Sequence, residues 1–315
     1  MNARSPSSFS LLLCFIAILF SGSSSAGLKV VVSIMPIHSL VCGLMSGIGQ
    51  PYLLLKGNQS PHTMTLKPSD MRAISQADLL LWVGESLESP LARVVEKGMI
   101  SGRVVSLLDT PNLHLLPVRN DLEWSHHDHS NHEDSDHAHD EHNWDSHIWL
   151  SPENARTIAD HLAQQLIRLD PEHTTDYQTN LQNLLQRIDR LEMAFRTNIN
   201  EVKEQPFIVF HDAYRYLENH FDLKAVGSVS VSPERQSGAK HIHKLRQKIR
   251  RLEAICVFSE PQFEPKLVAT LIAGTEASAG ILDPLGMALT PGEDAYFQLM
   301  NALSENFASC LGGKK

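Results

Sequence analysis

The feature that most constrains the fold is an alternation of short apolar runs with helical stretches, interrupted once by a long amphipathic segment. Strands that are covered on both faces read as continuous apolar runs, and their alternation with helices is typical of a mostly parallel sheet. The predicted strands are Leu28–Ile34, Tyr52–Leu55, Asp78–Val83, Arg103–Leu107, Phe207–Phe210, Ala225–Val229, Ala254–Phe258 and Gly280–Leu282. Four precede the long segment and four follow it, which predicts two α/β domains.

The long segment runs from Pro171 to Asn200. Its apolar side chains recur at steps of three and four, so they share one face of a helix. These side chains are Tyr177, Leu181, Leu184, Leu185, Ile188, Leu191, Phe195 and Ile199. About 30 residues at 1.5 Å each give roughly 45 Å, a length that suits a strut between domains. We therefore predict an N-terminal α/β domain over 27–170, a linking helix over 171–200 and a C-terminal α/β domain over 201–315.

The other predicted helices fill the gaps between the strands. They cover Ile37–Gly47, a short stretch from Ser69, Pro152 to Leu169, Tyr214–His220, His241–Leu252, Pro265–Ala273 and the chain from Asp294 onward. The helix at Pro152 has a favourable start, because Ser151 can cap it and proline is preferred at the first helical position.

Residues 1–26 read as a secretory signal peptide. Arg4 supplies a positive charge, Leu11–Phe20 is an apolar core too short to span a bilayer, and Ser24-Ser25-Ala26 offers small residues for cleavage. We expect a mature protein that begins near Gly27 and is exported to the periplasm.

The charge is concentrated in an insert over residues 121–146. The 315-residue chain carries 27 Lys and Arg against 36 Asp and Glu, and eight of its 17 histidines lie between His126 and His147. The insert alternates histidine with Asp or Glu and has no apolar periodicity, so we expect a mobile loop. The net charge of −9 argues against nucleic acid as a partner, because phosphate binding needs a basic face.

Export would place the cysteines of the mature chain in an oxidising compartment, where pairs tend to close. We pair Cys256, in a predicted strand, with Cys310 near the C-terminus, and we expect Cys42 to be a buried thiol. The sequence leaves other pairings open.

Four candidate metal ligands follow predicted strands or lie next to a helix start. His62, His211 and Asp283 come after strands, and His147 lies between the insert and the helix at Pro152. Ligands of open α/β sheets bind beyond the carboxyl ends of the strands, so a cleft between the domains can gather all four side chains. Three imidazoles and one carboxylate suit tetrahedral Zn²⁺.

Five motifs occur in order along the chain, and together they carry a family resemblance. They are SPHTMTLKPSDMRAISQADLLLWVG, DSHIWLSPENA, FIVFHDAYRYLE, VFSEPQF and LDPLG. With the signal peptide and the histidine-rich insert, they resemble the zinc-binding component of high-affinity zinc ABC importers, the ZnuA type.

The resemblance implies two four-stranded parallel sheets joined by one long rigid helix, with Zn²⁺ bound between the domains. It matches His62, His147 and His211 to the histidine ligands and Asp283 to an acidic position of the family, and it supports the pairing of Cys256 with Cys310. Some relatives carry a glutamate before the first histidine, where this chain has Pro61. The fourth ligand is then Asp283, water or a residue of the insert, and we favour Asp283. Manganese-type relatives have a carboxylate where His211 stands, which makes manganese the less favoured metal.

Two further sets of residues are secondary candidates. Glu260 is a candidate hydrogen-bond partner for a metal-binding histidine. A weak zinc-collecting role is assigned to the histidines of the insert, which are His126, His127, His129, His132, His137, His139 and His142.

The predicted function is capture of Zn²⁺ outside the cytoplasmic membrane and its delivery to an ABC-type zinc permease with its ATPase. We expect a monomer that is not an enzyme, with an auxiliary periplasmic zinc chaperone as a further candidate partner. Two alternatives stay open. A zinc-dependent hydrolase can use three histidines and water, and a metal-buffering or adhesion protein can bind zinc without meeting a permease.

Overall fold

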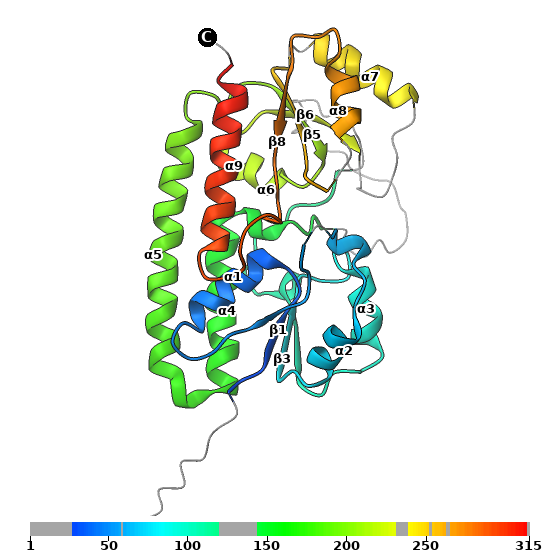
Figure 1. Cartoon of the computed structure of the whole chain (residues 1–315). Coiled ribbons are helices and arrows are strands. Elements are labelled where there is room, and N and C mark those ends of the chain that lie inside the picture. The colour runs from blue at the N-terminus through cyan, green and yellow to red at the C-terminus, as the bar shows by residue number, and fades with distance from the viewer. Residues whose placement is uncertain are drawn as a thin grey trace, which may run out of the picture.

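Two parallel four-stranded sheets lie one above the other, with helices around both (Figure 1). The computed structural model describes residues 27–57, 59–119, 144–230, 239–251, 254–262 and 265–313. The N-terminal sheet has the order β2-β1-β3-β4, with β1 Val30–Val32, β2 Tyr52–Leu53, β3 Leu79–Trp82 and β4 Arg103–Ser106. The C-terminal sheet has the order β6-β5-β7-β8, with β5 Phe207–His211, β6 Ala225–Ser230, β7 Cys256–Ser259 and β8 Ser278–Ile281.

The helices follow the strands in the order that the alternation predicts. They are α1 Met35–Leu44, α2 Pro68–Ser75, α3 Ser89–Glu96, α4 Pro152–Leu169, α5 Thr174–Ile199, α6 Arg215–Phe221, α7 Ala239–Arg251, α8 Pro265–Ile272 and α9 Ala295–Leu311. As predicted, Ser151 caps α4, because its hydroxyl accepts a hydrogen bond from the Asn154 N–H at 3.2 Å. None of the helices in the described part of the chain is long and apolar enough to cross a membrane.

The C-terminal sheet is covered on both faces. Phe207 and Val209 of β5 belong to the large core that also holds Phe307 of α9. The intervening Ile208 and Phe210 belong to a second, smaller core under α7 and α8. This split follows from the strand period of two, which sends alternate side chains to opposite faces.

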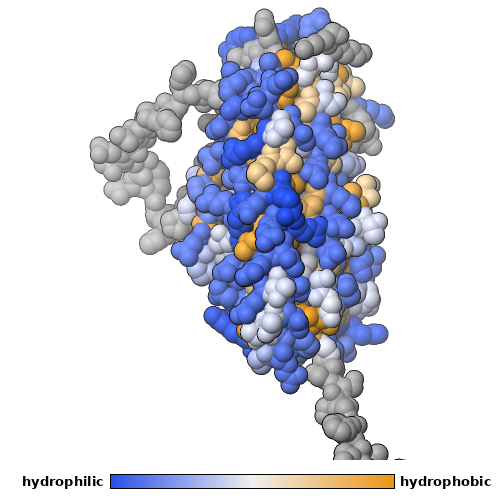
Figure 2. All heavy atoms as spheres, turned by 90° about the vertical axis from the view of Figure 1, so that its left-hand side faces the viewer, coloured by the Kyte–Doolittle hydropathy of each residue, from blue (hydrophilic) through white to orange (hydrophobic). Residues whose placement is uncertain are grey.

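The long helix α5 contacts both halves of the molecule through its predicted apolar stripe. Six of the eight stripe residues are buried, and Leu181 and Leu185 pack partly buried against the core. Near its start, the Asn180 side chain donates to the Leu44 carbonyl at 2.9 Å. Near its end, the Phe195 ring stacks on Phe221 of α6 at 4.1 Å between centroids. Figure 2 shows that the opposite, outer side is largely hydrophilic.

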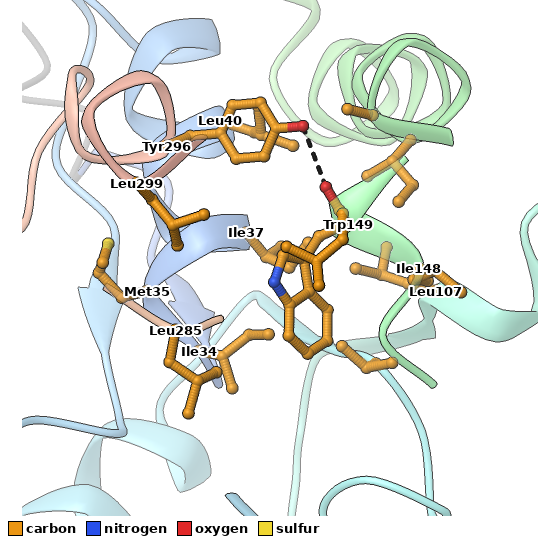
Figure 3. Close-up of a cluster of buried hydrophobic side chains, with 14 of the residues drawn as sticks. Ile34, Met35, Ile37, Leu40, Leu107, Ile148, Trp149, Leu285, Tyr296 and Leu299 are labelled. Atoms are coloured by element: carbon orange, nitrogen blue, oxygen red, sulfur yellow. Dashed lines mark hydrogen bonds between the residues drawn. The ribbon is translucent and has the colours of Figure 1, made fainter. Parts of the chain in front are cut away.

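The two halves also meet in a buried apolar cluster around Trp149 (Figure 3). Trp149 is fully buried, and Ile34 and Leu107 from the N-terminal half and Leu285 from the C-terminal half lie around it. Its indole N–H donates to the Pro284 carbonyl at 2.8 Å, and its own carbonyl accepts from the Tyr296 hydroxyl at 3.0 Å. The other half therefore holds Trp149 by both its side chain and its backbone.

Most elements lie where the sequence predicts them, although β1, β2 and α1 end earlier than predicted, and further differences concern α3, α5 and β8. Helix α3 was not predicted, although Ser89-Pro90 gives it a proline near its start. The chain from Pro171 begins as a 3₁₀ turn over Pro171–His173, so α5 starts at Thr174. Strand β8 starts at Ser278, two residues before the predicted Gly280. The division into domains stays a prediction, and the signal peptide lies outside the described residues.

The predicted disulfide between Cys256 and Cys310 is present, and Cys42 is a buried free thiol as expected. The bond joins β7 to α9 across a Cα–Cα distance of 6.1 Å and closes a chain segment of 54 residues. It therefore anchors the last helix to the C-terminal sheet.

We predict that replacing both Cys256 and Cys310 by alanine lowers the free energy of unfolding by about 4 kcal/mol, because the unfolded chain regains the entropy of an open loop. Urea unfolding followed by circular dichroism, with and without reductant, measures this change. Reductant should destabilise the wild type and a Cys42→Ala control but leave the double variant unaffected. Equal stability of the double variant and the oxidised wild type would contradict the prediction.

Candidate metal centre

The three predicted histidine ligands come from different parts of the fold. His62 lies in the 3₁₀ turn Pro61–Thr63, where the Ser60 hydroxyl accepts from the His62 N–H at 3.3 Å. His147 directly precedes the 3₁₀ turn Ile148–Leu150. His211 is the last residue of β5. Both His62 and His211 therefore lie at or beyond the carboxyl end of a parallel strand, where such sheets bind ligands.

The structure brings these three side chains together. One nitrogen from each ring lies within 4.8 Å of the others. The closest pair is Nε2 of His147 and Nε2 of His211, at 3.4 Å. A tetrahedral Zn²⁺ with Zn–N bonds of about 2.0–2.1 Å needs nitrogens about 3.3 Å apart. The spacing of the closest pair therefore already matches that geometry.

The other nitrogen of His147 is held by a carboxylate that the sequence analysis did not single out. Oδ1 of Asp145 accepts hydrogen bonds from the His147 Nδ1 at 2.7 Å and from the His147 backbone N–H at 3.0 Å. A proton on Nδ1 leaves the lone pair of Nε2 directed at the other histidines. The spacing D-x-H was the available signal, but Asp145 was counted with the acids of the insert.

A second carboxylate holds His211 in the same way. Oε1 of Glu260, a buried side chain that follows β7, lies 2.5 Å from the His211 Nδ1. The Gln262 amide in turn donates to Oε2 of Glu260 at 2.9 Å. The predicted secondary candidate Glu260 therefore contacts a histidine of the group, and it directs Nε2 of His211 toward His147.

The charges around the site favour a cation. Burial alone disfavours the charged form of His147, but the charge and hydrogen bond of Asp145 outweigh it and raise the pKa of His147 above its ordinary value. Glu260 adds to this effect. Two nitrogen lone pairs that face each other repel, so they need a proton or a metal ion between them.

Both ends of the insert are attached to the C-terminal half next to the site. The Tyr216 hydroxyl of α6 donates to the Asp145 carbonyl at 2.8 Å and accepts from the Leu116 N–H at 3.2 Å. Arg119 forms ion pairs with Asp212 at 3.3 Å and with Glu218 at 2.5 Å. These contacts fix the chain on either side of residues 120–143 and so fix the backbone of His147.

Asp283 is not brought into the group of three histidines. Its carboxylate instead accepts hydrogen bonds from the backbone N–H groups of Leu285 at 3.0 Å, Gly286 at 2.8 Å and Met287 at 2.7 Å. It thereby shapes the turn whose Pro284 and Leu285 line a small pocket with the histidines. Pro61 lines the same pocket and offers no ligand atom.

The seven histidines of the insert that were assigned a collecting role lie outside the described residues, as does most of the insert. Within the described ranges, His62, His147 and His211 are the only set of three or more His, Cys, Asp or Glu side chains with this spacing.

Comparisons with known proteins agree with this fold and with a role in zinc uptake. Residues 30–310 match the family described as "Zinc-uptake complex component A periplasmic", ZnuA. The "High-affinity zinc uptake system protein ZnuA" of Brucella abortus is 45% identical over 316 residues, covering 93% of this chain and 95% of that protein. Its counterpart in Yersinia pestis is 33% identical over 298 residues, covering 91% and 92%.

A solved structure of a ZnuA deletion mutant with zinc bound has the same fold, with a TM-score of 0.75 at 22% identity. The alignment covers 92% of this chain and 100% of the other. The family match over most of the chain and the 45% identity to a curated member make this chain a member of the ZnuA family.

Proposed function

We propose that this protein captures Zn²⁺ between its two halves with His62, His147 and His211 and delivers it to a membrane ABC permease. The observation that carries the proposal is the convergence of three imidazole nitrogens within 4.8 Å, two of them backed by buried carboxylates. Imidazole nitrogens suit zinc, whereas carboxylate-rich sites suit manganese.

Membership in the ZnuA family indicates the role of the protein in zinc uptake. The protein is a periplasmic zinc-binding component of a zinc uptake system, not an enzyme, and it works with a membrane permease and its ATPase. The hydrolase alternative is therefore not retained. We further propose that it acts as a monomer, that residues 1–26 direct its export, and that an auxiliary zinc chaperone is a candidate partner.

The charge of the bound ion is balanced by carboxylates outside the three histidines, because the histidines themselves are neutral when they bind it. Neutral imidazoles leave the two positive charges of Zn²⁺ uncompensated, and a buried charge needs a partner. Asp145 and Glu260 supply two negative charges one layer further out, each through the histidine that it holds. We propose that this arrangement favours a divalent cation over a monovalent one.

We predict that His62→Ala, His147→Ala or His211→Ala weakens zinc binding by roughly 100-fold or more, because each removes one of three nitrogen ligands. Competition with a chromogenic chelator measures the dissociation constant. His243→Ala, at an exposed position of α7, is the matched control and should bind as the wild type does. Unchanged tight binding in all three site variants would remove the assignment.

The carboxylates should contribute less than the ligands themselves. We predict that Asp145→Asn or Glu260→Gln weakens zinc binding by about 10–100-fold, because the imidazole loses the partner that orients it and raises its basicity. The same chelator competition tests this. An effect equal to loss of a histidine would make either carboxylate a direct ligand instead.

Zinc binding should weaken as the pH falls. Asp145 raises the pKa of His147 above its ordinary value of 6.5, and zinc needs the unprotonated ring, so binding is strongest above that raised pKa. Below it, a proton competes with zinc for His147, and the dissociation constant should rise by about tenfold per pH unit from this residue. Calorimetric titrations between pH 8 and pH 5 measure this dependence. A flat profile across that range would contradict histidine ligation.

A further inference from the structure

Gln262 is held beside the metal centre in one orientation. Its side-chain N–H group donates to Oε2 of Glu260 at 2.9 Å, and Oε1 of the same carboxylate lies 2.5 Å from the His211 Nδ1. An ionised carboxylate only accepts hydrogen bonds, so the amide must turn its nitrogen to Glu260 and its carbonyl oxygen away from it.

That carbonyl oxygen is buried and has no hydrogen-bond partner in the described part of the chain. Gln262 lines the same small pocket as His62, His147 and His211. Buried carbonyls are rarely left without a partner, because losing the hydrogen bond to water is unfavourable. The oxygen is therefore available to a group that enters the pocket together with the ion.

The coordination chemistry indicates what that group is. Zinc in proteins prefers four ligands, and the three histidines provide three. Pro61 has no donor atom, and Asp283 already accepts three backbone hydrogen bonds. Among the described residues, no carboxylate joins the three histidines. A neutral ligand with a hydrogen to donate, which is water, fits the remaining position.

We propose that Gln262 is a further positioning residue of this site, whose side-chain carbonyl accepts a hydrogen bond from a water molecule that is the fourth ligand of the bound zinc. The inference rests on the proposed function. It gives Gln262 two roles: its N–H group orients Glu260, and its carbonyl orients the water. It also makes the ligand shell neutral, so Asp145 and Glu260 carry the whole charge balance.

Two variants separate these roles. Gln262→Met has a similar volume but neither hydrogen-bonding group, and Gln262→Glu keeps an acceptor oxygen but loses the N–H group that faces Glu260. We expect chelator competition to show weaker zinc binding for both variants, with a loss severalfold greater for Gln262→Met, which removes both hydrogen bonds, than for Gln262→Glu, which removes only the contact with Glu260. Gln186→Met, at an exposed position of α5, is the matched control.

Equal weakening in both variants would mean that Gln262 acts only through Glu260, and wild-type binding by Gln262→Met would give the residue no role; either result overturns the proposal. Thermal unfolding of the metal-free variants identifies any that fold poorly. The visible spectrum of the Co²⁺-loaded protein should change in Gln262→Met, which a purely structural effect on folding would not cause.

A crystal structure of the zinc-loaded wild type tests the proposal independently of the variants. The expected result is a water oxygen bound to zinc and within hydrogen-bond distance of Oε1 of Gln262. A fourth ligand from Asp283, from the insert or from Gln262 itself would overturn the inference and leave the three-histidine function intact. Failure of the wild type to bind zinc would instead overturn the proposed function.

Discussion

The burial of Trp149 between the two halves is the contact on which the geometry of the metal centre depends. Two polar groups of Trp149 form hydrogen bonds across the interface. The indole N–H donates to the Pro284 carbonyl, and the backbone carbonyl accepts from the Tyr296 hydroxyl. His147 lies two residues before Trp149, and the turn that carries Pro284 lines the same pocket. The Trp149 cluster, with these two hydrogen bonds, thus sets how far the histidines of the two halves lie from each other.

Placing two histidine nitrogens 3.4 Å apart has an electrostatic cost that the surrounding carboxylates offset. The facing nitrogens of His147 and His211 repel when both carry lone pairs, and they repel more strongly when both are protonated. Asp145 and Glu260 hold the outer nitrogens and lower the energy of any positive charge placed between the rings. The site therefore suits a cation, and both carboxylate residues are themselves held, Asp145 through its backbone carbonyl by Tyr216 and Glu260 through its side chain by Gln262.

The sequence predicted the sheets well, and it also predicted that His62, His147 and His211 come together, because both depend on local patterns. Strand positions follow from apolar runs, and His211 follows from its place at the end of one. Helix α3 was not predicted, because its eight residues are too few for a clear helical period. Asp283 is the instructive case, since an acid after a strand looks like a ligand. Whether its oxygens point to a metal or to the backbone of its own turn depends on the conformation of Leu285–Met287, which no spacing in the sequence reveals.

The role of Asp145 was hidden for a different reason. Asp145 lies in the insert, where acids alternate with histidines. The Tyr216 hydroxyl, 71 residues further along the chain, donates to the backbone carbonyl of Asp145. This contact positions the Asp145 carboxylate to accept a hydrogen bond from His147. Contacts at such separation are set by the tertiary fold, so they escape an argument from neighbouring residues.

Delivery, as proposed, requires that a site held this firmly also release its ion, and the three histidines differ in how firmly they are held. His147 and His211 are buried, and each is bonded to a buried carboxylate. His62 is more exposed and lies on a three-residue 3₁₀ turn. The long helix α5, the C-terminal helix α9 and the Trp149 cluster tie the two halves together, which opposes a wide opening. We therefore expect release to begin with a local movement of the turn that carries His62, because that movement removes one ligand without separating the halves.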